Sequence, residues 1–341
     1  MTRGGILDYD SVLSGAGRAV CRRINFRLGS VSQQWSRIMR QLKCFITLSA
    51  VLGLLAVSSP SAHSCVGARP YGMGLAFIAV ADDINAAYWN PAGLVQLDLR
   101  EATYMRNVNA RDSINYQDYY AYAQPLDENS VIALSYISTV RISDMWDQDW
   151  YWLSYAYRLS PETSLGVNIR SVDDDVYVPG VSIDSRLQMD FAVFHRLSED
   201  MTIGLLIQNA NEPETKMRES IGMYAEEELT LTNVRNWRPG IAYKPDPTLT
   251  VALSVYDALD EGDGAIRHLR LGVEKVVEND TGRYLAYRLG YVGLWKKSDA
   301  VAPAGPTLGF GYGTETFKLD AALLMGDFDD AMFVSATARF R

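Results

Sequence analysis

The feature that most constrains the fold is a strict alternation of apolar residues with polar or small ones. Leu249, Val251 and Leu253, for example, are separated by Thr250 and Ala252. The same pattern is clear at 165–169, 201–207 and 332–340. Successive side chains of a β-strand point to opposite faces, so each segment has one apolar and one polar face. Because a helical period is almost absent after residue 97, the sequence predicts an all-β fold.

Fourteen such segments follow one another along the chain. They cover about 98–110, 114–125, 129–140, 149–160, 162–172, 180–196, 200–210, 233–243, 247–258, 265–276, 281–292, 303–313, 316–326 and 330–341. Short turns alternate with connections that are mostly longer and irregular, of which 210–233 is the largest. An even strand number with short turns on one side and long loops on the other is typical of an outer-membrane barrel.

The two faces decide between this barrel and a soluble β-sandwich or solenoid. A sandwich needs polar outer faces, whereas here the apolar face is the regular one and the other face suits a lumen. The chain also has 20 Tyr and 7 Trp, many near segment ends, where they would form aromatic girdles at the membrane interfaces. The sequence therefore predicts a transmembrane antiparallel barrel of about 14 strands over 98–341. Its penultimate Phe340 makes the outer-membrane assembly machinery an expected partner.

A secretory leader precedes this region. Residues 39–64 combine Arg40 and Lys43, an apolar run over 44–57 and a small-residue end, which are the parts of a signal peptide. The apolar run is too short for a comfortable membrane crossing. We expect cleavage between Ser64 and Cys65, and hence a protein of the cell outer membrane. The Arg-rich residues 1–38 are interpreted as a misassigned start or an extended leader, without a fold.

Cleavage would leave a strongly acidic chain with one cysteine. Residues 65–341 hold 24 Lys and Arg against 39 Asp and Glu, a formal charge of −15. This balance argues against nucleic-acid binding, which needs basic patches. Cys65 has no partner for an internal disulfide. Lipidation of Cys65 is the alternative. The sequence disfavours it, because Ala62 stands where a Leu usually precedes a lipidated cysteine.

Residues 65–97, between the leader and the strands, are predicted to be a plug segment. A barrel of fourteen strands encloses more space than side chains alone can fill. The segment is rich in small residues, which let its backbone approach a wall closely. Its marked features are three glycines, an acidic pair and a turn motif: Gly67, Gly72, Gly74; Asp82, Asp83; Asn90, Pro91, Ala92, Gly93.

This block resembles the N-terminal segment of the PorV/PorQ group, within the superfamily of the long-chain fatty-acid transporter FadL. The resemblance covers about thirty residues. It implies a fourteen-stranded outer-membrane barrel with the segment inside as a plug, and an Asn-Pro-Ala turn carried here by Asn90, Pro91 and Ala92. It also implies passive transport of a hydrophobic small-molecule ligand. The alternative is a PorV-like role in type IX protein secretion, with the 210–233 loop docking secretion partners.

Other functional features are few. Pro239 and Gly240 are the best candidates for a kink that opens the wall, because proline removes a ladder donor; the alternative is a strand that begins at Pro239. His195 and His268 have no accompanying catalytic motif and are interpreted as surface or girdle residues, so we expect no enzyme. The acidic runs do not match the spacing of a calcium loop, and no metal or cofactor is expected.

Overall fold

The computed structural model describes residues 65–108, 117–143, 146–177, 181–221, 225–259, 267–296, 304–326 and 331–341. The predicted leader, its cleavage residue Ser64 and the stretch before it lie outside these ranges. Within them, no helix combines the length and the apolar character that a membrane crossing requires.

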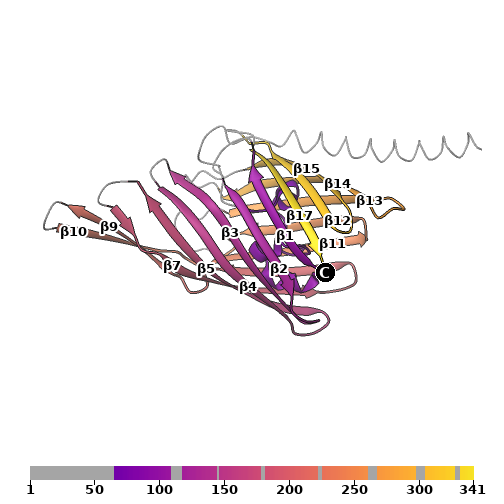
Figure 1. Ribbon diagram of the computed structural model, residues 1–341, viewed down its shortest axis with the longest axis horizontal. Helices are drawn as coiled ribbons and strands as arrows, with labels where there is room; N and C mark the ends of the chain where they lie inside the picture. The colour runs from indigo at the N-terminus through magenta and orange to yellow at the C-terminus, as the bar shows by residue number, and fades with distance from the viewer. Residues whose placement is uncertain are drawn as a thin grey trace, which may run out of the picture. The chain divides into compact units, whose positions relative to one another are not determined.

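Fourteen antiparallel strands close into a barrel (Figure 1). In chain order they are β1 (Arg100–Asn107), β2 (Asp118–Pro125), β3 (Ser130–Ser143), β4 (Trp146–Arg158), β5 (Thr163–Val176), β7 (Arg186–Arg196), β8 (Met201–Gln208), β11 (Asn236–Asp246), β12 (Leu249–Tyr256), β13 (Arg267–Glu278), β14 (Tyr284–Lys296), β15 (Gly305–Gly313), β16 (Phe317–Leu324) and β17 (Ala331–Phe340). β1 pairs with β17 over eight residues and closes the ring. The predicted antiparallel barrel of about 14 strands is confirmed.

Two predicted segments need correction. The strand expected over 180–196 is two strands, β6 (Val181–Ile183) and β7, and the loop expected over 210–233 contains a hairpin of β9 (Glu214–Ile221) and β10 (Ala225–Thr232). β6, β9 and β10 form a second sheet in the order β10-β9-β6. Hydropathy missed this hairpin because it is charged: Arg218 pairs with Glu228 across it, at 3.0 Å.

The barrel exposes apolar side chains and buries polar ones. In β7, Leu187 and Phe191 are 61% and 52% exposed, whereas Gln188 and Asp190 between them are buried. β5 and β12 repeat this arrangement, which reverses that of a water-soluble sandwich, whereas β3 buries the apolar Val131, Ala133 and Ile137. An outward apolar face and an inward polar face suit a wall that contacts lipid.

Residues 65–97 are almost entirely buried and contact strands on opposite sides of the ring. Three short helices lie in this stretch: α2 (Ala68–Gly72), α3 (Ala86–Trp89) and the 3-10 helix η2 (Pro91–Gln96). α2 packs on β14 to β17, whereas η2 packs on β3, β4, β5 and β7. Phe77, Ile78 and Trp89 are fully buried in the apolar core that this stretch shares with the wall.

Candidate functional site

The contacts between residues 65–97 and the wall define the candidate site, and ion pairs at Arg69 are their centre. Arg69 in α2 pairs with both members of the predicted acidic pair, Asp82 at 2.6 Å and Asp83 at 2.8 Å. Its Nε and Nη2 also donate to the two carboxylate oxygens of Glu274 in β13, each at 2.8 Å. This bidentate pairing is the strongest interaction that arginine forms with a carboxylate.

Further wall residues extend this network. Arg288 in β14 bonds Glu274 at 2.6 Å and Asp320 at 2.7 Å, and Lys244 in β11 contacts Asp82 at 2.9 Å. Burial by itself would raise the pKa of Asp82, but the charges of Arg69 and Lys244 outweigh it and hold that pKa well below its usual value. Asp82 is therefore an ionised link between the segment and the wall at neutral pH.

A separate carboxylate fixes the segment near the start of the barrel. Glu101 in β1 is fully buried and accepts a hydrogen bond from the backbone N–H of Ile84 at 2.9 Å. Lys318 and Arg339 compensate its charge at 3.5 Å and 3.0 Å. Nothing in the local sequence indicates this role, because Glu101 stands at the beginning of a strand that otherwise alternates like its neighbours.

The predicted turn motif caps η2. The Asn90 side chain donates to the carbonyl oxygens of Ile78 (2.8 Å) and Val193 (3.1 Å) and accepts from the backbone N–H of Ala92 (3.1 Å). Pro91 occupies the first helical turn, where its missing N–H costs nothing. A Cβ on Gly93 would lie 2.3 Å from the carbonyl oxygen of Ala81, so only glycine fits there.

The predicted glycines of the segment lie against glycines of the wall. A Cβ on Gly290 would lie 2.0 Å from the backbone nitrogen of Gly74, and one on Gly309 would lie 2.7 Å from the Cα of Gly72. Gly74 also has a φ of 58°, a conformation that disfavours other residues. Gly67, the third predicted glycine, has a φ of 86° and its N–H contacts the sulfur of Met105 at 2.9 Å.

The wall glycines were missed by the sequence reasoning. Gly204 of β8 stands opposite Gly240 of β11, and Gly272 of β13 stands opposite Gly290 of β14. At these positions the wall has no side chains, so the backbone of 73–79 can lie directly against it. The available signal was glycine at the polar positions of alternating segments, which marks a close backbone approach.

Pro239 and Gly240 lie within β11, which begins at Asn236 rather than at Pro239. Pairing with β8 runs through both residues without a register shift, and pairing with β12 begins at Gly240. Close to the proline, the N–H of Ala258 still bonds the carbonyl oxygen of Trp237 at 2.8 Å. A wall opening at this kink stays a prediction, whereas a packing role for Gly240 against Ile78 is visible.

The remaining predicted residues are placed as follows. Cys65 is buried, and its carbonyl oxygen accepts from the Gln117 side chain at 2.6 Å, so a lipid on its sulfur would require the chain to rearrange. His195 contacts the Thr163 hydroxyl at 2.8 Å. The expectation of a surface or girdle place for His268 is wrong: it is 1% exposed, because its polar position in β13 faces inward. Within the described ranges no acidic, His or Cys cluster is arranged to hold a metal.

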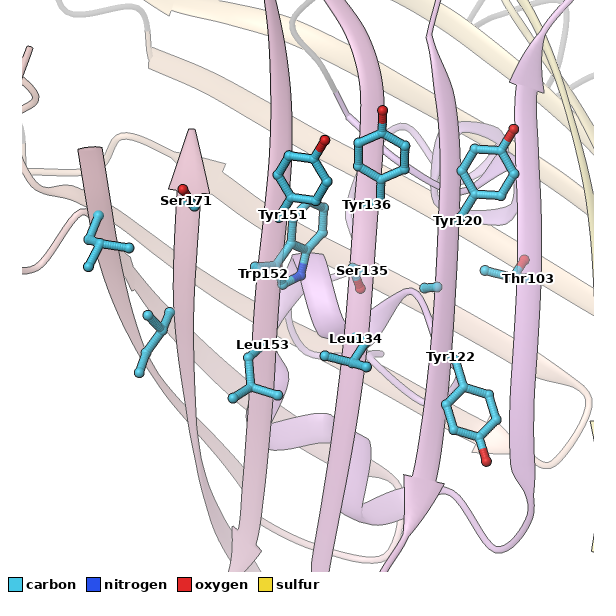
Figure 2. Close-up of a pocket in the computed structure, with 13 residues that line it drawn as sticks. Thr103, Tyr120, Tyr122, Leu134, Ser135, Tyr136, Tyr151, Trp152, Leu153 and Ser171 are labelled. Atoms are coloured by element: carbon cyan, nitrogen blue, oxygen red, sulfur yellow. The ribbon is translucent and has the colours of Figure 1, made fainter. Parts of the chain in front are cut away.

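Two of the hollows along the described part of the wall differ in character. One, of 640 Å³, lies over β1 to β5 and β7, and Figure 2 shows Tyr120, Tyr136 and Tyr151 side by side within it with their hydroxyls pointing the same way. The rings of Tyr136 and Tyr151 stack at 4.6 Å, as expected for an aromatic girdle. The other hollow, of 260 Å³, is polar and lies where η2 meets the turn between β4 and β5.

The fold matches known channels, although no protein-family model and no curated protein sequence matches the chain. A structure described as the CymD monoaromatic hydrocarbon channel aligns with a TM-score of 0.55 and 12% identity, covering 82% of this chain and 99% of its own. The Ralstonia pickettii toluene transporter TbuX aligns at 0.53 and 10% identity, covering 81% and 98%. A FadL homologue of Pseudomonas aeruginosa aligns at 0.53 and 12%, covering 83% and 99%. The chain thus shares the barrel fold of these three proteins.

Proposed function

We propose that the protein is an outer-membrane channel for passive uptake of hydrophobic small molecules, with residues 65–97 as its plug. The observation that carries this proposal is the combination of an apolar outer wall with a buried segment that contacts both sides of the ring. The similar structures described as a monoaromatic hydrocarbon channel and a toluene transporter support the class of ligand. The expected leader and assembly by the outer-membrane machinery belong to this proposal.

The contacts of the segment support a plug that is attached firmly. Ion pairs, backbone contacts with glycines and a shared apolar core join it to the wall. Breaking a buried ion pair from one side is strongly destabilising, and a packed apolar core resists partial movement. Passage therefore requires the segment to move relative to the wall against these contacts.

Uptake into liposomes that contain the purified barrel tests this function. We expect toluene to enter faster than into protein-free liposomes, and a polar solute of similar size, such as glycerol, to remain excluded. Equal exclusion of both solutes would contradict the channel and favour the alternative, a PorV-like secretion component. That alternative has one structural point in its favour: β10 is an edge strand of the second sheet, and edge strands can pair with a strand of a partner.

A further inference from the structure

Most charged groups that link the segment to the wall are balanced. These groups form two sets of ion pairs. Arg69, Lys244 and Arg288 pair with Asp82, Asp83, Glu274 and Asp320, and separately Lys318 and Arg339 pair with Glu101. Between the neighbouring strands β5 and β7, Arg170 pairs with Asp190 at 3.6 Å. Against this background, any buried cation without a carboxylate stands out.

Two arginines are such exceptions. Arg238 of β11 and Arg270 of β13 are each 2% exposed, and neither has a carboxylate within 4.0 Å among the described residues. Both lie next to the ring of Tyr256: their guanidinium carbons are 4.1 Å and 4.6 Å from its centroid, so the two carbons are at most the sum of these distances apart. Arg270 also lies 5.4 Å from the ring centroid of Trp89 in α3.

Their hydrogen bonds leave donors unused. Arg238 donates only to neutral amides, Asn236 at 3.1 Å and Gln208. Its Nη1 and the Nε of Arg270 are buried, and no acceptor for either is present within the described residues. The carboxylate of Asp190 is already used by Arg170 and by the backbone N–H of Asn209.

This arrangement is costly unless something compensates it. An arginine remains charged at any physiological pH, and an unpaired charge removed from water costs several kcal/mol. The contacts with Trp89 and Tyr256 recover only part of this cost. Two neighbouring guanidinium groups with free donors suit an oxyanion, whose geometry matches the arginine fork.

We propose that Arg238 and Arg270 together bind one oxyanion group, beside the aromatic rings of Trp89 and Tyr256. The group is either the carboxylate of an organic acid, whose apolar part lies on those rings, or a free inorganic oxyanion. This inference rests on the proposed channel function and makes its ligand class more specific.

Calorimetric titration of the purified barrel in detergent tests the proposal with three probes: benzoate, inorganic phosphate and the neutral benzyl alcohol. We expect benzoate or phosphate to bind and benzyl alcohol to bind more weakly than benzoate. R270Q is expected to weaken anion binding about tenfold or more, the usual worth of a charge-assisted hydrogen bond. The matched control R235Q, which removes an exposed arginine paired with Glu212, is expected to leave it unchanged.

Each result decides between the possibilities. If phosphate and benzoate bind equally well, the site takes a free oxyanion. If only benzoate binds, the ligand is an organic acid. Absence of binding by both anions, or equal affinities of R270Q and the unchanged protein, overturns the proposal. If R270Q does not fold, R270K and R238K are measured instead, because lysine retains the charge but lacks the planar guanidinium group. Anion affinities of both variants equal to that of the unchanged protein would then overturn the proposal. Toluene uptake by the unchanged protein, measured in parallel, shows whether the channel function fails separately.

Discussion

Replacing Arg69 by glutamine tests whether ion pairs hold residues 65–97 in the barrel. The change removes the cation that joins Asp82, Asp83 and Glu274. Asp82 keeps Lys244 at 2.9 Å and Glu274 keeps Arg288 at 2.6 Å. Only Asp83 loses its recorded cation, although the amide groups of Asn85 still bond it.

The free-energy cost of R69Q follows from the number of carboxylates that keep a cation. Breaking a buried ion pair from one side costs about 3–5 kcal/mol, and a single uncompensated carboxylate places R69Q at the lower end, about 3 kcal/mol. This corresponds to roughly a hundredfold rise in the ratio of detached to attached segment, at about 1.4 kcal/mol for each factor of ten. The barrel wall, whose ladders do not involve Arg69, is expected to remain closed.

Single-channel recording in planar bilayers measures the detached population as open-pore conductance. We expect R69Q to show frequent ion-conducting openings where the unchanged protein shows rare ones. R235Q is the control, because it removes an ion pair of similar length at an exposed site. If R69Q conducts no more than R235Q while circular dichroism shows an intact barrel, the ion pairs do not hold the segment and the reasoning fails.

Three further outcomes are expected. G290V would push a side chain into the backbone nitrogen of Gly74, which lies 2.0 Å from an ideal Cβ at position 290. It should either prevent folding or raise conductance as R69Q does. A stable G290V with unchanged conductance would contradict the close approach. N90A removes three hydrogen bonds of a buried cap and should lower the unfolding free energy by about 1–3 kcal/mol in urea titrations, with no change meaning that water replaces them. Because the folded-state pKa of Asp82 lies below its usual 3.8, its stabilising contribution is complete above pH 3.8 and is lost as the pH falls further. Conductance should therefore rise only below about pH 3.8, and a constant conductance down to pH 2 would argue against this role of Asp82.

The sequence alone determined the strands of the barrel with good accuracy. A strand that faces lipid on one side and a polar interior on the other must alternate at every residue, so β5, β8 and β12 could be located to within a few residues. The Asn90-Pro91 turn was equally local, since proline fixes its own backbone angle and restricts the residue before it. The β9–β10 hairpin escaped because charged residues interrupt its apolar alternation, as Glu219 does two positions after Met217 and Glu227 two positions before Leu229.

Only the closed barrel decided which distant residues meet. Arg69 and Glu274 are 205 positions apart, and the pairing of Gly74 with Gly290 depends on the register of strands that close the ring. The approach of Arg238 to Arg270 likewise requires β11, β12 and β13 to lie in one order. Alternation states which face a side chain occupies but not its height or its neighbour across the lumen, and these are fixed by strand register and tilt when the barrel closes.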